Sequence, residues 1–304
     1  MAFDADLIFD RRRLKRQLTF WRLVALAALV ALVVVSFARF AGDGLWRRDY
    51  VARLTVDGLI LDDAGRLKAL RALEKSPHAK ALIVAVDSPG GTFTGGEALY
   101  EELRRLAKTK PVVAVMGGTA TSAAYMISAA TDHIVARRGT ITGSIGVILQ
   151  TADVTGLLDK LGVKPETFKS GPLKAQPNPL EPLGDKARQA TQDLLMELYG
   201  QFVDIVAQRR GMARDKVLTL ADGRVFTGIS AKAAGLVDAI GDETAARAWL
   251  AKARGIAETL PVHEVDTGDD GPAWRDVLTL DLKKALFSER VRLDGVFSLW
   301  HPSL

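Results

Sequence analysis

The hydrophobic pattern in the middle of the chain predicts two strand–helix units in succession. Residues 81–91 form an apolar run that ends in two glycines, and leucines at helical spacing follow over residues 95–109. Residues 111–118 repeat the apolar run and its paired glycines, and the small and apolar residues from Ser122 onward suit a helix buried in a core. The two glycine turns therefore fall at the same end of neighbouring strands, which is the usual place for a site in an α/β sheet.

The pattern on either side extends this unit into one α/β domain over residues 43–260. Short apolar or alternating runs predict further strands, and amphipathic spacing predicts further helices: strands at 50–61, 133–136, 143–149 and 165–169, and helices at 64–75, 154–161, 185–210 and 243–254. Residues 170–184 are rich in proline, which predicts an extended loop. Residues 261–304 are expected to be an acidic linker and a tail with a short helix over 274–287.

The N-terminus carries a second pattern, in which five basic residues between Arg11 and Arg16 precede an apolar run from Leu23 to Ala38. This predicts a transmembrane signal anchor over residues 20–40, because flanking arginines can reach the headgroups and aromatic residues suit the interfaces. The positive-inside rule then places the basic residues 1–19 in the cytoplasm and the rest of the chain across the membrane. A cleavable signal peptide is the alternative, since the chain has a small-x-small sequence ending at Ala38.

The amino-acid composition excludes several kinds of site. The 304 residues include no cysteine, which excludes disulfides, thiolate metal sites and a cysteine nucleophile. The four histidines show no metal-ligand spacing, and no cofactor or metal is expected. The net charge is +5, but nine Lys/Arg and five Asp in residues 1–50 account for +4 of it. A nucleic-acid partner is therefore not expected.

Ser122 is the candidate nucleophile. A serine at the start of a helix lies among unpaired N–H groups, where a developing oxyanion is stabilised. Such a serine can also be an ordinary helix cap. Capping does not explain the double glycines at both strand ends or the alanines that follow Ser122.

The base that would activate Ser122 is a lysine rather than a histidine. A histidine base needs a nearby turn and a carboxylate behind it, and neither His78 nor His133 has that context. A lysine needs only burial that lowers its pKa from about 10.4 toward 7–8. Lys174, in the proline-rich loop, is the best-placed candidate; Lys164 and Lys169 are alternatives within or beside a predicted strand.

Five motifs occur in the order seen in the signal peptide peptidase A family of serine peptidases, which the chain resembles over roughly residues 50–255. They are DSPGG, GGTATSAAY, GSIGV, KSGPLK and GRVFTG-x₆-GLVD. The resemblance implies a fold similar to the Clp protease and crotonase superfamily, behind a membrane anchor. It also implies that Ser122 is the nucleophile and Lys174 the general base.

The same resemblance suggests three supporting residues. Gly91 and the backbone N–H of Ala123 look like the oxyanion donors, and Ser144 looks like the hydroxyl that orients the lysine. The chain departs from the family where Ala123 and Ala124 replace two glycines and where Ala175 replaces an acidic residue after Lys174. The two alanines narrow the space beside the nucleophile. Ala175 leaves open how neighbouring residues adjust the pKa of the lysine base.

The family resemblance makes a serine endopeptidase with a Ser/Lys dyad the leading function, with cleaved signal peptides as substrates. It places the catalytic domain on the outer, periplasmic side of the bacterial cytoplasmic membrane. The chain resembles the short, single-copy form, which implies a homo-oligomer, an octameric ring in which a neighbouring subunit supplies the lysine. A crotonase-type acyl-CoA enzyme and a catalytically silent membrane scaffold are the alternatives.

Overall fold

The computed structural model describes residues 20–30, 32, 48–268 and 297–299. Two compact units divide the chain at Asp49–Tyr50. In the first unit, residues 20–30 are helical. Within the described ranges no helix has both the length and the apolar character needed to cross a membrane. Residues 31 and 33–40 of the predicted anchor lie outside those ranges, as do the basic residues 1–19 and the predicted helix at 274–287.

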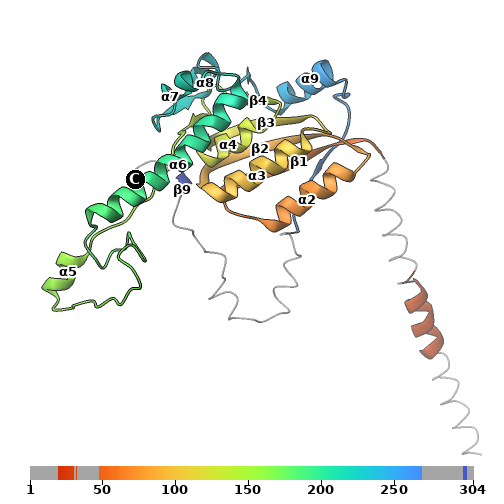
Figure 1. The fold of residues 1–304 in the computed structure, drawn as a ribbon. Helices are drawn as coiled ribbons and strands as arrows, with labels where there is room; N and C mark the ends of the chain where they lie inside the picture. Colours follow the sequence, from red (N-terminus) through yellow and green to blue (C-terminus); the bar gives the residue numbers. More distant parts are fainter. Residues whose placement is uncertain (1–19, 31, 33–47, 269–296, 300–304) are drawn as a thin grey trace, which may run out of the picture. The chain divides into compact units, whose positions relative to one another are not determined.

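The second unit is built on a mainly parallel sheet, so the predicted α/β class is confirmed. Figure 1 shows the helices arranged around this sheet. The central strand order is β6-β5-β3-β2-β1-β8, with β4 paired to β3 and β7 paired to β4. The strands are β1 (Tyr50–Ile60), β2 (Ala79–Thr92), β3 (Val112–Thr121), β4 (His133–Ala136), β5 (Ile141–Gly143), β6 (Val225–Thr227), β7 (Ala239–Ile240), β8 (Val262–Glu264) and β9 (Phe297–Leu299).

Helices cover both faces of the sheet because its central strands are apolar on both sides. In β2, Leu82 and Val84 face the larger core, whereas Ala81 and Ile83 face a smaller one. The helices are α2 (Ala64–Lys75), α3 (Phe93–Leu106), α4 (Ala123–Ala129), α5 (Thr155–Lys160), α6 (Asp185–Arg210), α7 (Arg214–Leu218), α8 (Gly228–Ala233) and α9 (Glu243–Arg254). The larger core includes residues of α2, α3, α4 and α6, and α9 covers the smaller one.

Two predicted strands are wrong. Residues 143–149 do not form one, because Gly143 and Ser144 have φ values of 84° and 50° and turn the chain out of β5 after three residues. Residues 165–169 have no regular structure. They pair with no strand of the described sheet, and the Phe168 side chain is 94% exposed.

The short strands β8 and β9 at the edges of the sheet were not expected from the pattern. β8 adds a parallel edge to β1, just beyond the residue 260 at which the predicted domain ends. β9, from the predicted tail, pairs antiparallel with β2 at Gly90, Gly91 and Thr92. The other edge of β2 is occupied there by β1, so β9 lies on the edge that faces β3.

Candidate active site

Ser122 lies between the last residue of β3 and the first residue of α4. Its backbone has φ 57° and ψ −122°, and its side chain makes no capping hydrogen bond. The left-handed φ is unfavourable for a residue with a Cβ, and such strain gathers at functional sites. The Ser122 N–H donates to the Gly143 carbonyl at 2.8 Å, and its carbonyl accepts from Met126 N at 3.0 Å. These backbone bonds hold the strained turn. Because the side chain makes no capping hydrogen bond, the explanation of Ser122 as an ordinary helix cap fails.

Ser144 lies beside Ser122 because the two follow paired residues on neighbouring parallel strands. Thr121 of β3 pairs with Gly143 of β5, and adjacent strands are about 4.8 Å apart. Ser144 also has a left-handed φ, and its N–H donates to the Arg224 carbonyl at 2.8 Å. Both serines are buried. The structure therefore brings these two predicted site residues together.

Gly91 lies near the end of β2, with its Cα packed on the backbone of β1. A Cβ at this position would lie 1.9 Å from the Ile60 carbonyl oxygen, so no other residue fits without moving β1. On the neighbouring strand, the Thr121 hydroxyl donates to the Pro89 carbonyl at 2.9 Å. The glycine turn of β2 is thus joined directly to the residue that precedes Ser122.

Ala123 follows Ser122 as the first residue of α4 and is completely buried. Its methyl group packs on Gly96 of α3, where a Cβ would come within 2.9 Å of it. Gly96 therefore accommodates the alanine that replaces the family's glycine. The neighbouring helix provides this space, and the sequence pattern alone did not reveal it.

Lys174 is not brought to this cluster within one chain. It lies in a turn closed by a hydrogen bond from its own N–H to the Gly171 carbonyl at 3.1 Å, and its side chain is exposed. Within the described part of the chain, its amine makes no hydrogen bond to Ser122 or to Ser144. Ala175, the next residue, has a φ of 59° and, like Ser122 and Ser144, is a non-glycine residue with a left-handed backbone.

The loop that carries Lys174 belongs to an extension formed by α5, residues 161–184 and the first half of α6. Figure 1 shows this extension reaching away from the sheet. The second half of α6 packs on the core, where Phe202 and Val206 are buried and Arg209 Nε donates to the Ala129 carbonyl at 2.9 Å. From Asp185 to Phe202 the helix is about 25 Å long at 1.5 Å per residue.

No histidine of the described ranges lies near Ser122. His133 begins β4 and pairs with Val113, near the start of β3, whereas Ser122 follows the end of that strand. Eight residues of strand separate the two positions by about 26 Å. His133 instead stacks on Trp249, with ring centroids 4.7 Å apart, and burial lowers its pKa despite the nearby Asp238. His78 and His263 also lie at the amino ends of strands, beside Tyr50.

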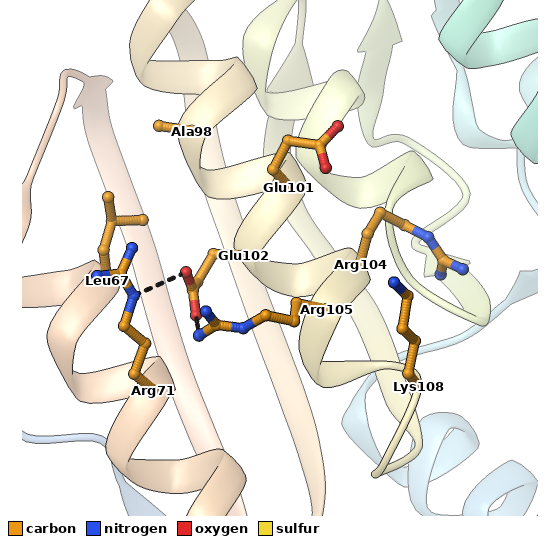
Figure 2. A pocket seen from close by; sticks show the side chains of 8 residues that line it. All are labelled: Leu67, Arg71, Ala98, Glu101, Glu102, Arg104, Arg105 and Lys108. Carbon is orange, nitrogen blue, oxygen red and sulfur yellow. Dashed lines mark hydrogen bonds and ion pairs between the residues drawn. The ribbon is translucent and has the colours of Figure 1, made fainter.

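A surface pocket of about 430 Å³ lies elsewhere, between α2 and α3. Figure 2 shows Arg71 and Arg105 converging on Glu102, whose side chain is nearly buried. The other lining residues are Leu67, Ala98, Glu101, Arg104 and Lys108. None of the predicted site residues lines it. The described residues also include no cluster of three or more side chains that could hold a metal ion.

Comparisons with known proteins decide the family. The sequence profile of peptidase family S49 matches residues 104–257. The chain belongs to peptidase family S49. The α/β sheet with its helices fits this family, and the protein is a serine peptidase, as the resemblance to signal peptide peptidase A indicated.

Three relatives show which proteins this S49 peptidase is similar to. A candidate protease of Synechocystis sp. is 41% identical over 211 residues, which are 69% of this chain and 76% of the relative. A candidate signal peptide peptidase of Enterococcus faecium is 33% identical, over 74% of this chain and 70% of its own. The chloroplastic serine protease SPPA of Arabidopsis thaliana is 30% identical, over 82% of this chain but 40% of its own length.

Proposed function

We propose that this S49 peptidase is a membrane-anchored serine endopeptidase in which Ser122 and Lys174 form the catalytic dyad. The observation that carries the proposal is the pairing of β9 with Gly90, Gly91 and Thr92. That edge of β2 accepts an extended segment in antiparallel register, next to β3, which ends immediately before Ser122. A peptide substrate bound in the same way would pass its carbonyl groups between the Gly91 N–H and Ser122.

The chemistry follows from this arrangement. The Ser122 hydroxyl oxygen attacks the scissile carbonyl carbon, and the Lys174 amine accepts the hydroxyl proton. The N–H groups of Gly91 and Ala123 stabilise the negative charge that develops on the carbonyl oxygen. The protonated lysine then gives its proton to the leaving amine. Water, deprotonated by the lysine, hydrolyses the acyl-enzyme, and Ser144 orients the amine in both steps.

The lysine comes from a neighbouring copy of the chain. The extension that carries Lys174 also exposes a group of large apolar side chains, which marks it as an interface rather than a free surface. They are Leu157, Leu161, Val163, Phe168, Leu173, Leu180, Leu194 and Met196. A head-to-tail ring, octameric as in the short members that the chain resembles, would cover this surface and place each Lys174 beside the neighbour's Ser122.

Location and substrates complete the proposal. Residues 20–40 anchor the protein in the cytoplasmic membrane, and the catalytic domain lies outside it, in the periplasm. The name of the Enterococcus faecium relative supports cleaved signal peptides as substrates. A reporter fused after Phe40 should be active outside the cytoplasm, and a mature N-terminus at Arg39 would show that the segment is a cleaved signal peptide instead.

The decisive experiment mixes two inactive variants, Ser122→Ala and Lys174→Ala. In randomly mixed rings about a quarter of the interfaces combine an intact serine with an intact lysine, so about a quarter of the wild-type activity should return. Ser128→Ala mixed with Lys174→Ala is the matched control and should show about half of the wild-type activity, because every subunit then keeps Ser122 and half of them keep Lys174. No recovery in oligomers shown to have exchanged subunits would mean that one chain supplies both residues.

A further inference from the structure

The turn at Pro89–Gly91 pairs with β1 and β9 through Gly90 and Gly91, but its ladder to β3 is interrupted, and side-chain hydroxyls attach it to its neighbours on both sides. The β2–β3 register shifts between Val86 and Ser88, so the ladder is interrupted just before the turn. Proline has no N–H to donate, and Gly90 has a φ of 116°, which is accessible to glycine. Backbone pairing with β3 therefore does little to fix the direction of the Gly91 N–H.

Ser88 holds the turn on the side of β1. Its hydroxyl donates to the Gly58 carbonyl at 2.6 Å and accepts from the Gly90 N–H at 3.1 Å. A longer contact to the Gly90 carbonyl, at 3.3 Å, competes for the same single proton, and the shorter bond takes it. The Ser88 side chain is completely buried, so water cannot replace these bonds.

Thr121 holds the turn on the side of β3. Its hydroxyl donates to the Pro89 carbonyl at 2.9 Å, and the residue is completely buried. Thr121 immediately precedes Ser122 and pairs with Gly143 of β5. One hydrogen bond therefore links the strand that carries the nucleophile to the turn that carries Gly91.

We propose that Ser88 and Thr121 are positioning residues that fix the Gly91 N–H relative to the Ser122 hydroxyl. This inference rests on the proposed function, in which Gly91 is an oxyanion donor. The N–H acts on charge that exists only in the transition state, so misplacing it lowers kcat and leaves KM nearly unchanged. A role in folding alone would leave both constants unchanged.

Five variants separate a positioning role from a role in folding. Ser88→Ala and Thr121→Val each remove one buried hydroxyl from the turn, and valine keeps the shape of threonine. The matched controls are Ser128→Ala and Thr131→Val, which remove buried hydroxyls from the last turn of α4 and from the residues just after it. These hydroxyls also donate to backbone carbonyls: that of Ser128 to the Ala124 carbonyl at 2.7 Å, and that of Thr131 to the Ser128 carbonyl at 2.8 Å. Thr121→Ser serves as the conservative rescue, because it keeps the bond to Pro89.

The test uses the full-length oligomer with a fluorogenic peptide and a peptide boronate, whose tetrahedral adduct mimics the transition state. Removing an oxyanion donor costs about 10²–10³ in kcat, so a donor that is displaced but present should cost about tenfold. In Ser88→Ala and Thr121→Val we expect kcat to fall by about this factor, with KM within about twofold of wild type. Boronate affinity should fall in parallel with kcat/KM, and Thr121→Ser should retain wild-type turnover.

Three results would overturn the inference. The controls could lose as much kcat as the two turn variants, the loss could appear in KM alone, or Thr121→Ser could be as impaired as Thr121→Val. Each would mean that the two hydroxyls do not position the Gly91 N–H, and so would a kcat and KM that both stay at their wild-type values in Ser88→Ala and Thr121→Val. Wild-type turnover that survives Ser122→Ala would instead overturn the proposed function, and the inference with it, so the two failures are distinguishable.

Discussion

Removing the Tyr125 hydroxyl should change stability in a way that depends on pH. Tyr125 lies on α4 and is completely buried, and its hydroxyl donates to the Leu236 carbonyl at 3.0 Å. Tyr125→Phe leaves that carbonyl without its partner, which costs about 1–2 kcal/mol of the free energy of unfolding at pH 7. For a domain of this size the melting temperature should fall by about 2–4 °C for each kcal/mol.

The pH dependence follows from linkage. Burial raises the pKa of Tyr125 well above its usual value of 10.0, so the folded protein keeps this hydroxyl neutral in alkali while the unfolded chain ionises it. The stabilisation is therefore present below pH 10 and is lost above it, at about 1.4 kcal/mol per pH unit. Wild type and Tyr125→Phe should become equally stable near pH 11.

Urea unfolding followed by circular dichroism at pH 7, 9, 10 and 11 measures this difference directly. Tyr199→Phe is a useful comparison. The Tyr199 hydroxyl donates to the Ala221 carbonyl at 2.8 Å from a partly buried position, and burial raises its pKa as well. It should show the same trend with a smaller amplitude. A difference between wild type and Tyr125→Phe that stays constant from pH 7 to 11 would refute the reasoning.

Three further predictions concern other parts of the protein. Asp238→Ala should destabilise the fold by about 3 kcal/mol at pH 7, because it leaves the Arg210 guanidinium and the Ile134 N–H without their partner. Burial raises the pKa of Asp238, but the hydrogen bonds and charge of Arg210 outweigh burial and hold the pKa below 3.8. Thermal melts should therefore show the difference in stability between wild type and Asp238→Ala shrinking as the pH falls below 3.8. Phe168→Asp should yield monomers by light scattering and no peptidase activity, since a charge enters the proposed interface. Deleting residues 297–304 should lower KM for peptides, because β9 then no longer competes for Gly91. An unchanged KM would mean that peptides do not bind at that edge of β2.

The helices and long strands could be predicted because burial imposes their pattern. The ranges of α2, α6, α9 and β4 agree with the prediction to the residue, since each presents apolar positions at a regular period to a core. The short strand at residues 143–149 was wrong because two left-handed residues in succession depend on their neighbours, which a hydrophobic pattern does not record. The pairing of β9 with β2 depends on contacts between residues about 200 positions apart, and nothing local signals it.

The site could be predicted in part. Paired glycines at adjacent strand ends indicated that the ends of β2 and β3 carry Gly91 and Ser122, and the parallel pairing of β3 with β5 places Ser144 beside Ser122. The hydroxyls of Ser88 and Thr121 attracted no notice, because serine and threonine are common and their hydrogen bonds form only in the folded sheet. The location of Lys174 could not follow from one chain, because its proposed partner lies on another copy.

The most direct test of the central claim is labelling of the full-length oligomer with a fluorophosphonate, followed by mapping of the modified peptide. We expect the label on Ser122 and none on the Ser122→Ala variant. Lys174→Ala should react far more slowly, because no base removes the hydroxyl proton. A label on a different serine, or undiminished labelling in Lys174→Ala, would contradict the account.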